Sequence, residues 1–388
     1  MAPQKGMFHM KRMLLIGDPD SLWIKRYIEN VLHPAGWETV VYPIYGWKGG
    51  YREDYAKMGV TIDEGLHTLP VLGRIPKVRM WAKVYACAAA LKKLGPFDAV
   101  HCHYLSVVDL ALGRVMARQQ GAPLAATFWG SDLLRTDEAT LRRMGRYLRA
   151  FHRLTVFNPE HVDRIRRLYG DEMAKKTLVL DFGEGVFPWI DKISGEGGRK
   201  AAKEHLGIGE DRLTVCIGSS ASESQQQLPA LRAIAAMDEK ILRRLTIILQ
   251  HTYAHDDPAN EEQVQNLLRS MPCENLILTD FLNDEESAYL RCAADVYLHT
   301  IRTDAFSSSM KEYLYAGARV AYGRWLAYPT LSELRLPVQS FAGFEDLPEL
   351  IRNALDGQWQ PLTDEERQRL GSICKWECLR PRWLALYE

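Results

Sequence analysis

This sequence lacks several features that would place a protein in a familiar class. It has no run approaching the ~20 apolar residues that a membrane-spanning helix needs, and its start, MAPQKGMFHMKR, does not read as a secretory signal. It has neither a G-x-G-x-x-G turn after its first strand nor a P-loop, so a nicotinamide or flavin dinucleotide site is not supported. Its seven cysteines are scattered, mostly inside apolar segments, as expected for a reduced cytoplasmic protein.

A zinc cluster is not expected either. His101, Cys102 and His103 are consecutive on a predicted strand, and strand alternation sends Cys102 to the face opposite the two histidines. For His103 we favour a histidine that is satisfied within the strand. We therefore predict no metal and no separate cofactor.

The net charge is zero, but the charge is divided unevenly along the chain. Residues 1–180 hold 27 Lys and Arg against 17 Asp and Glu, and the remainder holds 22 against 32, so the two parts carry +10 and −10. This division does not fit a general nucleic-acid binder, whereas it fits a basic half that faces an anionic surface. One predicted helix, from Asp137 to Arg153, concentrates arginines on a broad face at Arg142, Arg143, Arg146 and Arg149.

Those arginines allow three interpretations. The simplest is a solvated helix face. The second is peripheral docking on the anionic inner face of the cell membrane, which needs no inserted segment. The third is pairing with acidic residues of the C-terminal domain.

The chain of 388 residues is long enough for two domains. Its strands and helices alternate, as in doubly wound α/β domains, whose ligands bind beyond the carboxyl ends of the strands. We predict an N-terminal domain over residues 1–183, a linker rich in Gly, Lys and Glu over 184–210, a second domain over 211–355, and C-terminal helices over 356–388 that pack back on the domain junction.

The stretch 295–322 predicts a strand, a loop, a helix and a second strand. Three consecutive serines begin the helix: Ser307, Ser308 and Ser309. Their hydroxyls, the free N–H groups of a first turn and the helix dipole suit a phosphate. Ser308, Glu312 and Tyr315 share a polar face that we expect to point at a cleft, where a carboxylate can bind the two hydroxyls of a ribose. A serine N-cap with a solvated glutamate fits the same spacing.

A second corner of this kind follows the strand LTVCI. It runs into Gly218, Ser219 and Ser220 and then into a helix, so it also offers hydroxyls and backbone N–H groups to an anion. Tyr253, at the end of the buried strand LTIILQ, could stack on a base or merely pack. Phosphate sites beside a ribose site indicate a nucleotide.

Two motifs resemble those of retaining GT-B glycosyltransferases of family 4. Asp304 and Glu312 form a D-x7-E pair before YLYAGARVAY, similar to the E-x7-E region of that family, and FWGSDLLR is similar to its fHGsD segment. The resemblance implies that Asp304 contacts the donor sugar and that Glu312 holds the ribose. It aligns Gly130 and Asp132 with the acceptor-side turn, while Trp129 takes the place of the usual histidine. Asp132 fits an N-cap or turn acid equally well.

The Gly218 corner departs from family 4, which places an arginine and a lysine there. GSSASESQQQLPAL is closer to the G-N-S-x-x-P-x-x-x-H-x-x-A-L segment of the 4-acetamidofucose transferases of family 56. The charge that neutralises a diphosphate would then have to come from Arg302, Lys311 or Arg324.

These resemblances imply a fold and a function. The fold is GT-B, with two Rossmann-like domains facing across a cleft. The function is metal-independent transfer of a sugar from a nucleotide-sugar donor to a glycan or lipid-linked acceptor, with Asp304 and Asp132 as the catalytic acids. The alternatives are a GT-B nucleotide-sugar epimerase and a non-catalytic nucleotide-sugar binding protein.

Overall fold

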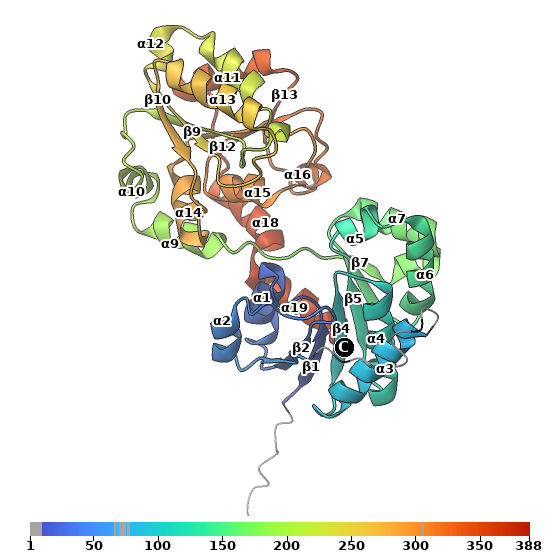
Figure 1. Cartoon of the computed structure of the whole chain (residues 1–388). Coiled ribbons are helices and arrows are strands. Elements are labelled where there is room, and N and C mark those ends of the chain that lie inside the picture. Colours follow the sequence, from blue (N-terminus) through green and yellow to red (C-terminus); the bar gives the residue numbers. More distant parts are fainter. Residues whose placement is uncertain (1–9, 66, 68, 70–74, 76–77, 305) are drawn as a thin grey trace, which may run out of the picture. The chain divides into compact units, whose positions relative to one another are not determined.

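The computed structural model describes residues 10–65, 67, 69, 75, 78–304 and 306–388. The start of the chain, on which the expectation about a signal segment rests, lies outside the described residues. The chain forms two compact units (Figure 1). Unit 1 contains the described residues up to Gly183 together with Trp376–Glu388, and unit 2 is Glu184–Lys375. Among the described helices, none has the length and hydropathy that a membrane crossing requires.

Unit 1 contains a parallel seven-stranded sheet in the order β3-β2-β1-β4-β5-β6-β7. Its strands are β1 (Arg12–Ile16), β2 (Glu38–Tyr42), β3 (Thr61–Ile62), β4 (Ala99–His103), β5 (Leu124–Thr127), β6 (Arg153–Val156) and β7 (Thr177–Val179). The central strands β1, β4 and β5 are buried along almost their whole length because helices cover both faces of the sheet.

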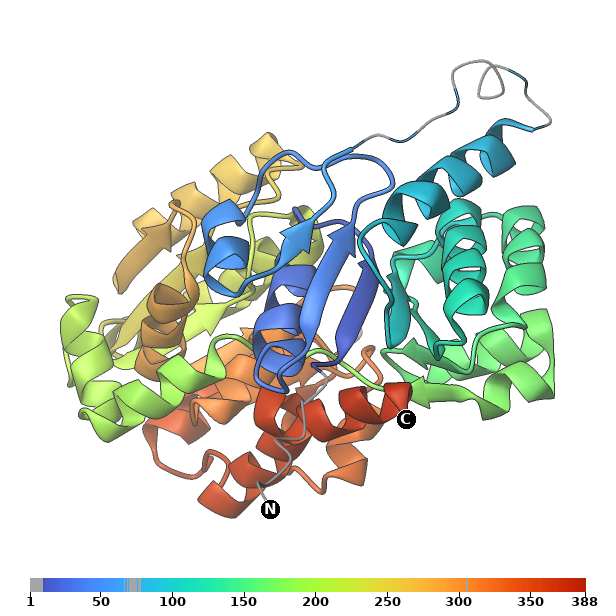
Figure 2. The same cartoon turned by 90° about the horizontal axis from the view of Figure 1, so that it is seen from below.

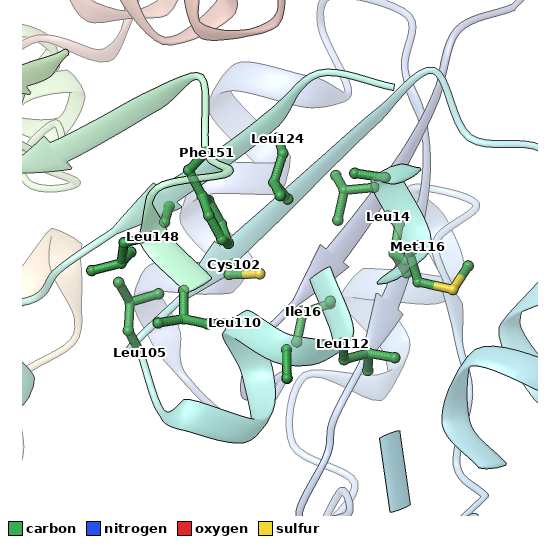
Figure 3. Close-up of a cluster of buried hydrophobic side chains, with 14 of the residues drawn as sticks. Leu14, Ile16, Cys102, Leu105, Leu110, Leu112, Met116, Leu124, Leu148 and Phe151 are labelled. Atoms are coloured by element: carbon green, nitrogen blue, oxygen red, sulfur yellow. The ribbon is translucent and has the colours of Figure 1, made fainter. Parts of the chain in front are cut away.

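Side-chain alternation along β1 divides the core of unit 1 into two layers. Leu14 and Ile16 join one cluster, shown in Figure 3, whereas Met13 and Leu15 join a second cluster on the opposite face. The first face is covered by α3 (Arg79–Lys92), α4 (Val107–Gln120), α6 (Glu138–Leu148) and α7 (Pro159–Tyr169), and the second by α1 (Leu22–Tyr27), the π-helix η1 (Ile28–Leu32) and α19 (Trp376–Leu384). Figure 2 shows the blue strands between blue α1 and cyan α3 and α4.

The other described elements of unit 1 are three short helices, α2 (Arg52–Lys57), α5 (Ser131–Leu134) and α8 (Asp171–Lys175), and the 3-10 turn η5 (Ala385–Tyr387).

Unit 2 contains a parallel six-stranded sheet in the order β10-β9-β8-β11-β12-β13. Its strands are β8 (Leu213–Ile217), β9 (Leu245–Gln250), β10 (Glu274–Leu278), β11 (Val296–His299), β12 (Arg319–Gly323) and β13 (Gln339–Phe341). Both sheets follow the strand order of doubly wound nucleotide-binding folds, in which the chain starts at the centre and extends first to one side and then to the other.

Helices cover both faces of this second sheet as well. One face carries α11 (Gln227–Ala235), α13 (Pro258–Ser270) and α17 (Leu347–Leu355). The other carries α9 (Phe187–Gly195), α10 (Gly198–His205), α14 (Asp284–Ala293), α15 (Ser308–Tyr315) and α18 (Asp364–Cys374). Short elements lie between them, namely η3 (Glu223–Gln225), α12 (Glu239–Leu242), α16 (Pro329–Glu333) and η4 (Phe344–Asp346).

One segment differs from the sequence-based expectation. Residues 184–210, predicted as a linker, are mostly occupied by α9 and α10, whose Ile190, Ile193 and Ala202 are buried in unit 2. The Gly-, Lys- and Glu-rich composition concealed this helical spacing of apolar residues. Helices are present in the predicted C-terminal segment, where α18 belongs to unit 2 and α19 belongs to unit 1, and their packing on the domain junction stays a prediction.

Candidate functional site

The strand order of unit 2 reverses between the neighbouring strands β8 and β11. The chain leaves β8 toward β9 on one side of the sheet, and it leaves β11 toward β12 on the other. The loops after β8 and β11 therefore start at the same edge and diverge, and ligands of doubly wound sheets bind at such a point. The corners predicted at Gly218 and at the start of α15 both lie here.

Hydrogen bonds hold these two loops together. The Gly218 N–H donates to the carbonyl of Leu298 in β11 at 3.1 Å, and the side-chain amide of Gln226 donates to the carbonyl of Thr300 at 2.7 Å. The hydroxyl of Tyr297 lies 3.4 Å from Ser309 Oγ and also interacts with the Ser219 side chain. Serines from the two predicted corners thus approach one tyrosine.

Three residues with a strained, left-handed backbone conformation lie at the same edge of the sheet. Gln226, Ala254 and Phe306 have positive φ angles of 52°, 61° and 66°, and they lie in the loops after β8, β9 and β11. A left-handed conformation costs a residue with a side chain ~1 to 2 kcal/mol. Such strain is typical of ligand sites, where the surrounding structure holds it in place.

Two glutamines support the Gly218 loop, and the sequence analysis did not assign them a role. Gln225 Oε1 accepts a hydrogen bond from the Ser219 N–H at 3.1 Å. Gln227 Nε2 donates to the carbonyl of Ile217 at 2.9 Å, while its Oε1 pairs with His251 Nε2 at 2.8 Å. Neutral side chains therefore brace this loop.

The helix α15 begins at the three serines, as predicted. Ser307 is the N-cap residue, but its hydroxyl accepts no hydrogen bond from the first turn of the helix. The alternative interpretation, a serine whose hydroxyl caps the helix, is therefore not supported. The hydroxyls of Ser307 and Ser309 lie 3.2 Å apart. Ser307 and Ser308 are partly exposed, whereas Ser309 is buried.

Asp304 is anchored in the loop after β11. Its Oδ2 accepts hydrogen bonds from the Ser307 N–H at 2.9 Å and from the Tyr328 hydroxyl at 2.7 Å, and it pairs with His299 Nε2 at 3.1 Å. Burial raises the pKa of Asp304, but these hydrogen bonds outweigh burial and hold the pKa well below its usual range. All three partners use Oδ2, and Oδ1 accepts no hydrogen bond from the described residues.

Glu312 does not lie on an open polar face. It is buried, and its Oε2 accepts a hydrogen bond from Arg291 Nε at 3.0 Å. Arg291 Nη1 also donates to Gln250 Oε1 and to the Tyr313 hydroxyl, each at 3.1 Å. Tyr315, predicted on the same face, is buried as well, so α15 is covered on all sides. Arg291 was not predicted from the sequence, where its one signal is its position in the otherwise apolar segment AYLRCAA.

The three candidate cations differ in availability. Lys311 is buried and pairs with Glu184 Oε1 at 3.0 Å, so its charge is already compensated. Arg302 is exposed and forms an ion pair with Glu223. Arg324 is exposed directly after β12. Arg302 and Arg324 are therefore the cations at this edge that can turn to a ligand.

Tyr253 follows β9 at the same edge. Its side chain is 49% exposed, and its carbonyl accepts a hydrogen bond from the Ala221 N–H at 3.0 Å. The backbone of Tyr253 therefore lies beside the loop after β8, and its side chain is half exposed.

In unit 1, Asp132 holds two neighbouring backbone segments. Its Oδ2 accepts from the Leu105 N–H at 2.7 Å and its Oδ1 from the Trp129 N–H at 2.8 Å. Burial raises the pKa of Asp132 to about 6, although the backbone hydrogen bonds lower it. Gly130 precedes α5 with φ of 101°, a conformation that favours glycine.

Trp129 contacts a buried histidine pair. Its Nε1 donates to His103 Nδ1 at 3.3 Å, and the ring centroids of His101 and His103 are 4.0 Å apart. His103 Nε2 is buried without a hydrogen-bond partner among the described residues, so the expectation of a fully satisfied histidine holds for one ring nitrogen. Cys102 lies on the opposite face, as strand alternation predicts. The described residues contain no group of three or more His, Cys, Asp or Glu placed to hold a metal ion.

The chain was compared with known proteins. No protein-family model and no curated protein sequence matches it. Its structure is similar to a glycosyltransferase from Rickettsia africae, with a TM-score of 0.71 and 12% identity over 98% of each chain. HepE from Anabaena, solved with UDP, has a TM-score of 0.67 and 14% identity over 97% of this chain and 99% of its own. A UDP-GlcNAc 2-epimerase from Neisseria meningitidis has a TM-score of 0.61 and 12% identity over 97% and 98%.

These similarities establish the fold. The chain is an α/β protein with the GT-B fold, which confirms the fold predicted from the sequence. The particular resemblances to families 4 and 56 stay predictions.

Proposed function

We propose that this chain is a glycosyltransferase that moves a sugar from a nucleotide-sugar donor to a glycan or lipid-linked acceptor, as in cell-surface polysaccharide or glycoconjugate synthesis. The observation that carries the proposal is the meeting of two serine-rich corners at the point in unit 2 where the strand order reverses. The similar structures include a glycosyltransferase and a protein solved with UDP-glucose, which agrees with such a donor.

Each group at this edge has a proposed role. The hydroxyls and backbone N–H groups of Ser219, Ser220, Ser307, Ser308 and Ser309 bind the diphosphate. Tyr253 stacks on the base, and Arg302 and Arg324 supply positive charge. Glu312 is largely buried and its Oε2 is occupied by Arg291, so its proposed contact with the ribose is made through Oε1. The open Oδ1 of Asp304 contacts the transferred sugar.

The proposed reaction exchanges one bond of the sugar. The bond between its anomeric carbon and the diphosphate oxygen breaks, the nucleoside diphosphate leaves with the bonding electrons, and the acceptor oxygen bonds to the carbon. The acceptor proton passes to a base, for which Asp132, with a pKa of about 6, is our candidate. Serine hydroxyls and N–H groups stabilise the charge on the departing diphosphate. We propose that the reaction needs no metal and, from the family 4 resemblance, that it retains the anomeric configuration.

We further propose that unit 1 carries the acceptor. The arginines of α6 and its C-cap are exposed, which suits a cytoplasmic protein that associates peripherally with an anionic membrane and reaches a lipid-linked acceptor there.

A non-catalytic nucleotide-sugar binding protein is the second candidate. The observation in its favour is that Asp132, Asp304 and Glu312 all have hydrogen-bond partners within the protein. A nucleotide-sugar epimerase is the third candidate, since one similar structure carries that name.

A panel of nucleotide sugars is expected to separate these candidates. A ligand at 100 times its Kd adds ~2.7 kcal/mol to the free energy of unfolding, so a thermal-shift screen will identify the donor. Release of the nucleoside diphosphate in the presence of an acceptor supports transfer. Binding without any reaction supports the second candidate, an altered sugar ring supports the third, and no thermal shift with any donor contradicts all three.

Asp304→Asn is expected to lower kcat roughly tenfold or more while the affinity for free nucleoside diphosphate stays nearly unchanged, because that ligand lacks the sugar. The measurements are steady-state turnover and calorimetric titration with the diphosphate. Tyr328→Phe is the matched control, since it removes one hydrogen bond to Asp304 without changing the carboxylate. Equal losses for sugar donor and diphosphate would assign Asp304 to the structure of the loop.

A further inference from the structure

An arginine-lined groove lies on unit 1, where α6 and α7 pack side by side (Figure 1). Its volume is about 480 Å³, and its lining residues are Glu138, Arg142, Gly145, Arg146, Arg149, Arg167, Leu168 and Tyr169. This volume falls within the ~300 to 1,000 Å³ of small-ligand sites. Arg167 comes from the helix after the one that the sequence analysis singled out.

The floor of the groove depends on a close contact between the two helices. The Tyr169 hydroxyl donates to the Leu141 carbonyl at 2.9 Å, which holds the ring against α6. Gly145 allows this approach, because a Cβ at this position would lie 2.8 Å from Tyr169 Cδ1. The groove is therefore part of the packing of α6 on α7.

The arginines of this region divide into those with partners and those without. Arg142 pairs with Glu138 at 2.8 Å. On α7, Arg164 donates to the Leu133 carbonyl at 3.0 Å, and Arg166 pairs with acidic neighbours.

Three arginines that line the groove are different. Within the part of the chain that the structure describes, the side chains of Arg146, Arg149 and Arg167 form neither a hydrogen bond nor an ion pair. Their guanidinium groups repel one another, and each presents a planar fork of N–H donors that matches the oxygens of a phosphate. An anion between them offsets the repulsion and replaces water at these exposed donors.

From this geometry we infer that the groove is a binding site for a phosphate group carrying at least two negative charges, such as a phosphomonoester or a diphosphate. The site lies in unit 1 and the proposed nucleotide site lies in unit 2, so the inference does not depend on glycosyl transfer. The phosphate could belong to a lipid headgroup or to a soluble molecule, and the two sources share this chemistry.

The test uses the whole chain and two probes, inorganic pyrophosphate in calorimetric titration and phosphatidylcholine vesicles with and without phosphatidate in co-sedimentation. Three groove arginines are replaced in R146Q/R149Q/R167Q. The matched control R114Q/R118Q/R153Q removes the same charge from exposed arginines of unit 1 outside the groove. These exposed substitutions are expected to change the free energy of unfolding by less than ~0.5 kcal/mol each, which thermal unfolding will check.

The groove variant is expected to bind at least ~10-fold more weakly than the control variant, because each charge-assisted hydrogen bond contributes to affinity. Binding of both probes assigns the site to any phosphate, and binding of phosphatidate vesicles alone assigns it to a lipid headgroup. Equal weakening in both variants would show a diffuse charge effect and overturn the inference, as would failure of the wild-type chain to bind either probe. R146K/R149K/R167K keeps the charge but loses the guanidinium forks, so full affinity in this variant would also overturn it.

Discussion

Arg291→Met is expected to lower the free energy of unfolding of unit 2 by about 3 to 5 kcal/mol. Arg291 is 4% exposed and Glu312 is 6% exposed, so the substitution would leave a carboxylate buried without its cation. It would also remove the hydrogen bonds to Gln250 and Tyr313 and the stacking of the guanidinium 4.5 Å from the centroid of the Tyr313 ring. Urea unfolding at neutral pH measures the loss.

Two further variants test the physical cause. Arg291→Met combined with Glu312→Gln removes both charges, and it is expected to recover part of the lost stability, since an uncharged pair avoids the burial of an unpaired ion. Arg243→Met breaks an exposed pair with Glu239 and is expected to cost less than ~1 kcal/mol. A similar small loss for Arg291→Met would mean that the buried pair does not stabilise unit 2.

Acid is expected to destabilise unit 1 through His103. Burial lowers the pKa of His103 to about 3, whereas an unfolded chain protonates histidine near ~6.5. Below pH ~6.5 the unfolded state therefore binds more protons, and the stability that His103 contributes falls by ~1.4 kcal/mol per pH unit until the folded pKa is reached. By pH ~4 the loss from this residue is of order 3 kcal/mol.

The measurement must separate His103 from groups that titrate in the opposite sense. Burial raises the pKa of Asp109 and of Asp132 to about 6, so the folded state takes up those protons first and gains stability on acidification. The useful quantity is the difference in unfolding free energy between His103→Phe and wild type from pH ~7 to ~4. Burial and the neighbouring His103 both lower the pKa of His101, so the difference reports the titration of the two coupled histidines together.

The difference is expected to change in favour of the variant by ~3 kcal/mol over that range. His33→Phe, at an exposed position, controls for the loss of an imidazole. A difference that does not vary with pH would mean that His103 titrates alike in the folded and unfolded chain.

Local sequence was enough to predict the doubly wound fold. Alternating apolar strands and amphipathic helices, together with glycine and serine at the strand ends, indicated the Gly218 and Ser307 corners, because strand and helix periodicity depends on neighbours a few residues apart. The same local criteria failed at residues 184–210, where composition suggested a linker and the burial of Ile190 and Ile193 in unit 2 produces helices.

Local sequence criteria could not identify the partners of the charged groups. Arg291 and Glu312 are 21 residues apart, Asp304 and Tyr328 are 24 apart, and the Tyr169 hydroxyl meets the Leu141 carbonyl 28 residues away. Sequence spacing placed Glu312 on a polar face, but the packing of α14 beside α15 buries it against a cation.

By itself, then, the sequence determined the order of the elements, the strand ends at which a ligand is expected and the basic character of the first half. Only the tertiary structure decided which carboxylates are already engaged, which arginines have no partner among the described residues and which glutamines brace the Gly218 loop. The physical reason is that periodicity and turn chemistry act over a few residues, whereas a buried charge or amide takes whichever partner the packing of distant elements brings within hydrogen-bonding distance.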